Sequence, residues 1–256
     1  MIGGLLFGAA FRDFLKPKRL LTWVLVAVGL FGLAKVYMAT RPDAEAAQTY
    51  VELSGIIGFR LLALVAAIFS SMVLSQEVEQ KTIVYLLTRP VDRKVMLLSR
   101  LAAAIAITAL VSLLGLVAIG LAVHGFALFG SEYFLKDIRA LLMGAVAYSS
   151  LFVLISLIVN RAMLVCLIFA FGWETVIPNF QGSVYLLSIY SYLTTIAERP
   201  SISAGGMFQA LAGQLGTNTL APGTAWTVMI VLSAVCIGVA AWWFSAFEYT
   251  PREDTE

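Results

Sequence analysis

Six long apolar runs, separated by more polar segments of different lengths, dominate the hydrophobic pattern of the chain. Each run is close to the ~20 residues that a helix needs to cross the hydrocarbon layer, although the fifth is shorter and ends at Pro178. Because only helices satisfy an open backbone there, the pattern predicts an all-α membrane protein with six transmembrane helices. The expected spans are 20–38, 56–75, 101–123, 140–159, 163–177 and 225–247.

The segment before the first span has the pattern of a surface helix. Its apolar residues recur at the spacing of one helix face; they are Phe7, Ala10, Phe11, Phe14 and Leu15. The basic stretch around Pro17 then interrupts the pattern. We therefore expect an amphipathic interfacial helix within 1–19, with its basic end near anionic head groups.

The connections between the spans differ in character. Residues 39–55 and 124–139 are expected to be ordinary polar loops. Residues 178–224 contain an apolar stretch, 183–197, that is rich in Tyr, Ser and Thr. This composition predicts a semi-buried outer segment with a re-entrant or interfacial helix. A seventh span over 183–197 is the competing interpretation.

Composition and charge narrow the class further. The chain is 61% hydrophobic and 12% charged, against about 25% charge in soluble domains. Its length of 256 residues fits one transmembrane domain, 1–256, without a second folded unit. With a cytoplasmic N-terminus, most Lys and Arg fall in cytoplasmic segments, so the positive-inside rule places both termini in the cytoplasm. An even number of spans agrees with that orientation.

Candidate chemistry is sparse. Cys166 and Cys236 are isolated within apolar runs, and His124 is the only histidine, so we expect no metal site and no catalytic residues. No lysine follows a glycine, which excludes a phosphate-binding loop. Glu174 lies near the end of the fifth span, where an ionisable group suggests a functional site. The alternative is an interfacial Trp173–Glu174 pair with a solvated carboxylate.

Residues 76–100 form a charged, partly amphipathic insert between the second and third spans. Ile83, Leu86 and Leu87 have helical spacing, and Thr82 is suited to cap the helix that they form. Pro90 ends that helix, because a helical residue before proline is disfavoured. A second short helix, 91–98, would lead into the third span. A hairpin that merely joins two spans explains the pattern equally well.

The insert resembles the pattern of ABC-2 type permeases of prokaryotic ABC transporters. Those subunits have an acidic residue, Gly-Thr, an apolar run, Arg/Ser-Pro and a basic residue before the third span. The matching residues are Glu77, Glu79, Thr82, Ile83, Leu86, Leu87, Arg89, Pro90 and Arg93, with Lys81 in place of the glycine. Trp173-Glu174, Pro178-Asn179 and Leu187-Ser188 also resemble recurring features of the family.

The resemblance implies a permease subunit of the inner membrane that is not itself an enzyme. It would dimerise, as a homodimer or related heterodimer, and pair with two ATP-binding subunits that hold ATP and magnesium. Residues 76–98 would form the coupling segment, with 82–87 as the coupling helix: Ile83, Leu86 and Leu87 fill a groove of the ATPase, and Glu77, Glu79, Arg89 and Arg93 contact its rim. Trp173, Glu174 and Pro178 would line an outer gate. Membrane lipids are a further expected partner, and no nucleic-acid partner is expected.

Two other functions fit the same pattern. A mechanical transmitter would pass ATPase motion to an extracytoplasmic partner without moving a substrate. A secondary transporter would need no ATPase, but it is expected to carry more charges deep in its spans than this chain does. A neighbouring gene for a Walker-motif ATPase favours the first two functions. The sequence selects no substrate class among lipids, drugs, ions, polysaccharides and peptides.

Overall fold

The computed structural model describes residues 4, 7–8, 11–12, 17–41, 45–79, 93–159, 161–179, 182–199 and 220–246. Within these residues the chain forms helices and turns and no strand. The long helices are α2 (Pro17–Thr40), α4 (Phe59–Glu79), α6 (Arg93–His124), α7 (Glu132–Ile158) and α12 (Pro222–Ala246). The shorter elements are α3 (Ala46–Leu53), η1 (Ser54–Gly58), η2 (Gly125–Gly130), α8 (Ala162–Ile168), η3 (Phe169–Trp173), α9 (Glu174–Val176), η4 (Ile177–Asn179), η5 (Gly182–Leu187) and α10 (Ile189–Ile196).

Five helices in the described part of the chain are long and apolar enough to cross a membrane. They correspond to the first, second, third, fourth and sixth expected spans, which confirms an all-α, multi-pass protein. The expected fifth span is a shorter apolar helix, Ala162–Val176. It consists of α8, η3 and α9, and η3 is a π-helical segment. The count of six crossings therefore remains a prediction.

The structure corrects three expected boundaries. Residues 46–55 are helical and not a polar loop, because their side chains have partners in the protein: Tyr50 is buried, and Glu52 accepts a hydrogen bond of 2.9 Å from the Tyr37 hydroxyl. Helix α7 begins within the second predicted loop, where Ser131 Oγ accepts from the Phe134 amide at 3.2 Å. Within the separate helix expected over 91–98, residues 93–98 are instead the beginning of α6, which continues to His124, and residues 91 and 92 lie outside the described residues.

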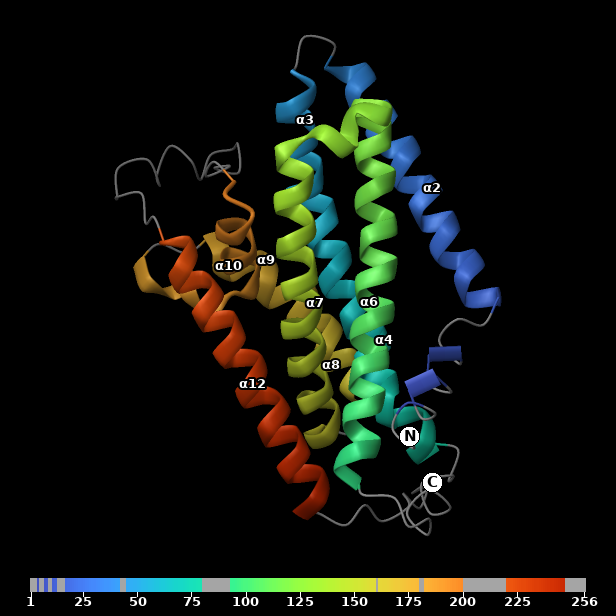
Figure 1. Ribbon diagram of the computed structural model, residues 1–256, viewed down its shortest axis with the longest axis vertical. Coiled ribbons are helices and arrows are strands. Elements are labelled where there is room, and N and C mark those ends of the chain that lie inside the picture. The colour runs from blue at the N-terminus through green and yellow to red at the C-terminus, as the bar shows by residue number, and fades with distance from the viewer. Residues whose placement is uncertain are drawn as a thin grey trace.

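The long helices form a bundle with α4, α6 and α7 at its centre (Figure 1). Helix α2 packs against α6, and α12 packs against α7. One end of the bundle, here named the α3 end, carries α3, η2 and the start of α7, whereas α4, α7 and α12 finish at the opposite end (Figure 1). Two apolar clusters fill the interior: one includes Tyr50, Leu62, Leu116, Tyr148 and Leu193, and the other includes Phe69, Leu97, Val153 and Phe244.

The segment from η5 to α10 packs against the bundle beside α7 and α12 (Figure 1). Helix α10 has 8 residues, about 12 Å at 1.5 Å per residue, which is too short to cross a bilayer. The interpretation of 183–197 as a seventh span is therefore wrong. Gly144 of α7 permits the close packing, because a Cβ there would lie 2.6 Å from Leu62 Cδ2 and 2.9 Å from Leu193 Cδ1.

At the N-terminus, residues 4, 7, 8, 11 and 12 are helical, as the amphipathic pattern predicts. The rings of Phe7 and Phe11 stack at 5.7 Å, and both pack against the second apolar cluster. Helix α2 begins at Pro17, since proline is well suited to the first position of a helix.

Candidate functional site

The predicted ATPase-contacting residues are only partly within the described structure. Thr82, Ile83, Leu86, Leu87, Arg89 and Pro90 lie outside the described residues. Glu77 and Glu79 belong to the last turn of α4, and Arg93 is the first residue of α6. Both helix ends lie at the end of the bundle opposite α3 (Figure 1). The connection 80–92 therefore joins two neighbouring helices at that end.

Helices α4 and α6 are packed together close to this connection. The Arg100 guanidinium of α6 donates a hydrogen bond of 3.1 Å to the Val73 carbonyl oxygen of α4. Phe69 and Leu97 are fully buried in the cluster between the helices. These contacts hold α4 and α6 to each other at this end of the bundle.

The Glu174 carboxylate holds the beginning of α10. It accepts hydrogen bonds from Ser188 Oγ at 2.5 Å and from the backbone amides of Ile189 and Tyr190, each at 3.1 Å. The buried Tyr148 hydroxyl interacts with the same carboxylate. The first amides of a helix have no partner within it, and an anion there is also favoured by the helix dipole. Glu174 is thus the cap of α10, supplied by a residue 14 positions before Ser188.

Trp173 supports the same contact. Its indole Nε1 donates to the Leu187 carbonyl oxygen at 3.2 Å, and its ring stacks on Phe169 with centroids 6.0 Å apart. Pro178 lies in η4, which follows α9. Since Glu174 is only 3% exposed, the interpretation as a solvated interfacial carboxylate is wrong.

The other end of α10 is fixed by Arg199, which the sequence did not identify. Arg199 Nη2 lies 2.7 Å from Asp137 Oδ2 of α7, and the two side chains are 3% and 2% exposed. The guanidinium also donates to the Val51 carbonyl oxygen at 2.5 Å and to Ser54 Oγ at 2.7 Å. It lies over the Phe59 ring, 4.6 Å from the centroid. One buried cation therefore joins α7, α3, η1 and α4.

A second ion pair lies directly beside the first. Lys136 Nζ is 2.7 Å from Glu198 Oε2 and 2.6 Å from Glu132 Oε1. Glu198 has φ of +48°, a left-handed conformation that is uncommon for a residue with a side chain. The nearby Lys136 ammonium lowers the pKa of the Glu198 carboxyl. We name the two pairs, Lys136–Glu198 and Asp137–Arg199, the outer clasp.

Glycine and tyrosine complete the contact between α10 and η1. The Tyr190 hydroxyl donates to the Gly55 carbonyl oxygen at 3.3 Å. A Cβ on Gly55 would lie 2.5 Å from Arg199 Nη1, so a larger residue there would displace the guanidinium from its present position. Glu174 at its start and the outer clasp at its end hold α10 on the bundle.

Comparison with known proteins identifies the family. A family model described as ABC-2 family transporter protein matches residues 13–194. The matched range contains the 80–92 connection, Glu174 and most of α10. No curated protein matches the chain in sequence. Because the family match covers well over half of the 256 residues, the chain belongs to the ABC-2 transporter family and is a multi-pass membrane permease subunit of an ABC transporter.

Proposed function

We propose that this permease subunit couples ATP hydrolysis, carried out by two separate ATP-binding subunits, to export of a substrate across a prokaryotic inner membrane. The ATP-binding subunits would hold ATP and magnesium. The observation that carries the proposal is the family match, which includes the connection with Thr82, the Leu86-Leu87 pair and Arg89-Pro90. A Walker-motif gene beside this one would add independent support.

The architecture supports coupling through 80–92. This connection joins α4 and α6 at one end of the bundle, whereas α10 and the outer clasp are connected to the other end of α4 through η1. Helix α4 is continuous with η1 and α3, since no residue between Ala46 and Glu79 leaves a helical conformation. A push on the connection would therefore reach the outer clasp along one rigid element.

The distribution of positive charge supports the orientation. Under the proposed topology 80–92, Arg161 and both termini face the cytoplasm, and the α3 end faces outward. Helix α4 and the α8–η3 segment are packed against each other. These elements correspond to spans two and five, which the family resemblance assigns to the dimer interface and the substrate path. Trp173, Glu174 and Pro178 would then lie beside the outer part of that path.

Mechanical transmission is a second candidate function, and the exposed apolar turn that follows α6 favours it. The 32 residues of α6 extend about 48 Å, well beyond a hydrocarbon layer of about 30 Å. At the following turn, η2, Phe126 is 90% exposed and Phe129 is also exposed. Such an exposed apolar turn at the outer end of α6 would suit contact with an extracytoplasmic protein.

Replacing both Leu86 and Leu87 with Asp should prevent association with the ATP-binding subunit. Two carboxylates on the predicted apolar face would have to be desolvated in the groove of the ATPase. We expect co-purification of the ATP-binding subunit with the tagged chain to fall by at least about tenfold. Tyr85→Asp with Thr88→Asp, on the opposite face of the predicted helix, is the matched control and should retain the partner. Equal recovery with both variants would show that 82–87 is not the docking helix.

A further inference from the structure

We propose that Arg60 of α4 is a switch residue for the outer segment. When the beginning of α10 separates from the bundle, the Arg60 guanidinium would move from Thr175 to Glu174 and neutralise the carboxylate that had held α10. The inference rests on the proposed function only for what moves α4. The exchange of partners itself is a property of the permease chain alone and is tested there.

The two ends of α10 are held in different ways. At its end, Arg199 forms a buried ion pair with Asp137 and donates two further hydrogen bonds. At its beginning, the Glu174 carboxylate accepts hydrogen bonds from neutral donors, namely the Ser188 hydroxyl and two backbone amides. Separation of the end would leave two buried charges without partners, whereas separation of the beginning would leave one. The beginning of α10 is therefore the part that can separate, with the outer clasp as the hinge.

Separation at this point would leave Glu174 in need of a new donor. Its side chain is buried, and of the groups that bond it only the Tyr148 hydroxyl of α7 lies outside the α10 segment. Within the described part of the chain, no cation lies at ion-pair distance from Glu174. A buried carboxylate that loses its donors is strongly unfavourable. The separated form therefore requires a cation that can reach Glu174.

Arg60 is the cation in the right place. Its Nη1 donates to the hydroxyl of Thr175, the residue that follows Glu174 in α9. Arg60 and Glu174 also interact electrostatically with the same two hydroxyls, those of Tyr148 and Tyr190. Because a guanidinium has five N–H donors in a planar fork, it can bind a carboxylate with two parallel hydrogen bonds. A short movement would thus exchange one neutral acceptor for a charged one.

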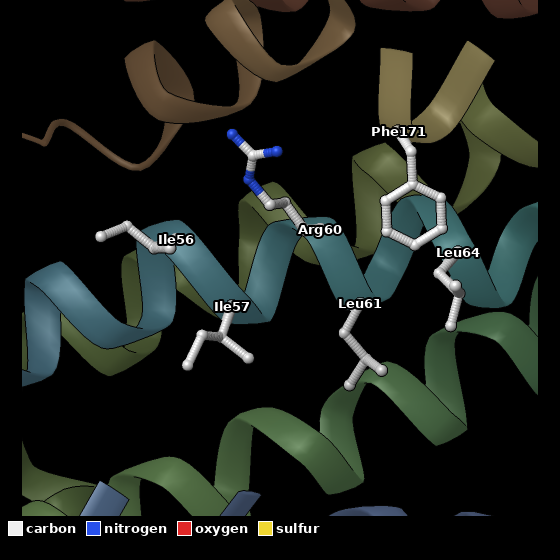
Figure 2. A pocket seen from close by; sticks show the side chains of 6 residues that line it. All are labelled: Ile56, Ile57, Arg60, Leu61, Leu64 and Phe171. Carbon is white, nitrogen blue, oxygen red and sulfur yellow. The ribbon is translucent and has the colours of Figure 1, made fainter. Parts of the chain in front are cut away.

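The position of Arg60 on α4 links this exchange to movement of that helix. Arg60 is the only charged residue between positions 59 and 75, and an ionisable side chain in such an apolar segment suggests a function. Figure 2 shows its guanidinium directed away from the neighbouring apolar side chains of Ile57 and Leu61. Since α4 also leads into the 80–92 connection, a displacement of α4 would move Arg60 relative to α9. Arg60 is thus a positioning residue that acts on α10 through Glu174.

The test is hydrogen exchange at the amides of 189–196 in the purified full-length chain, without ATP-binding subunits. Arg60→Gln should slow this exchange by about tenfold, because the ion pair lost from the separated form outweighs the single hydrogen bond lost from the closed form. Arg60→Lys retains the charge and should exchange at nearly the wild-type rate. Lys35→Gln, which removes an exposed cation of α2, is the matched control and should have no effect.

A second variant acts in the opposite direction. Thr175→Val removes the acceptor that holds Arg60 in the closed form, so exchange at 189–196 should accelerate. The double variant Arg60→Gln/Thr175→Val should exchange as slowly as Arg60→Gln alone, because without the guanidinium the loss of Thr175 has no further effect.

The direction of the change decides the outcome. Faster exchange in Arg60→Gln than in wild type would overturn the proposal, since Arg60 would then only support the closed form, and unchanged exchange would overturn it as well. If Arg60→Gln does not fold, Thr175→Val decides, because a wild-type rate would show that Arg60 does not move from Thr175 to Glu174. Failure of the proposed function is a separate result: a Leu86→Asp/Leu87→Asp chain that keeps its ATP-binding subunit leaves these exchange rates unaffected.

Discussion

Replacing Asp137 with Ala should lower the free energy of unfolding by about 3–5 kcal/mol, the cost of leaving a buried charge without its partner. Arg199 would keep its hydrogen bonds to Val51 and Ser54, but it would lose the carboxylate that neutralises it. For a protein of this size the change corresponds to a decrease of roughly 10 °C in apparent melting temperature. Thermal unfolding monitored by size-exclusion chromatography in detergent measures it.

Two further variants separate charge from packing. Asp137→Ala combined with Arg199→Met should be less destabilised than the sum of the two single variants, because no buried charge remains. Lys136→Ala removes the adjacent, more exposed pair with Glu198 and should change the melting temperature little. An Asp137→Ala protein that melts within about 2 °C of wild type would show that the buried Asp137–Arg199 pair does not stabilise the fold.

Replacing Glu174 with Ala should detach α10 from the bundle. Ser188 Oγ and the amides of Ile189 and Tyr190 would lose their acceptor in a buried site. Each unsatisfied buried group costs about 1–3 kcal/mol, so we expect a loss of several kcal/mol that is concentrated at α10. Hydrogen exchange should accelerate by at least about tenfold at the amides of 189–196, while α7 remains protected.

The nature of the cap allows a graded comparison. Glu174→Gln retains one acceptor oxygen but places an NH₂ group near the remaining donors, so its effect should be intermediate. Glu45→Ala is the matched control, because Glu45 occupies the N-cap position of α3 without a side-chain hydrogen bond. Equal exchange rates at α10 in Glu174→Ala and wild type would contradict the assigned cap.

Hydropathy was sufficient to predict the all-α class and the places of the long helices. The signal is strong because a helix of ~20 apolar residues is costly to place anywhere except in a bilayer or a core. The unusual character of the fifth span was also visible, since it is short and ends before Pro178. The pattern could not show that η3 is π-helical, because its sequence, Phe-Ala-Phe-Gly-Trp, continues the apolar run without a residue that marks the change.

The outer clasp could not be predicted from the sequence for a physical reason. Asp137 and Arg199 are separated by 62 positions. Each lies in a polar segment, which on its own predicts a solvent-exposed side chain. For the same reason 46–55 was expected to be a loop: Thr49 and Glu52 are polar, although Thr49 is buried and Glu52 is bound to Tyr37. A polar residue whose partner lies far away in the sequence can therefore be buried, although the polarity of its own segment predicts that it is exposed. Glu174 was identified as unusual because it is a single carboxylate at the end of an apolar run, but its partners at α10 were not.

ATP hydrolysis in the reconstituted complex tests the central claim most directly, namely that this permease is driven by separate ATP-binding subunits through 80–92. The measurement compares turnover in lipid nanodiscs for the wild-type chain, the Leu86→Asp/Leu87→Asp chain and the Tyr85→Asp/Thr88→Asp chain, each with the same ATP-binding subunits. We predict that the wild type and the Tyr85/Thr88 variant support equal turnover, whereas the Leu86/Leu87 variant gives only the rate of the ATP-binding subunits alone. Unchanged turnover with the Leu86/Leu87 variant would contradict the account.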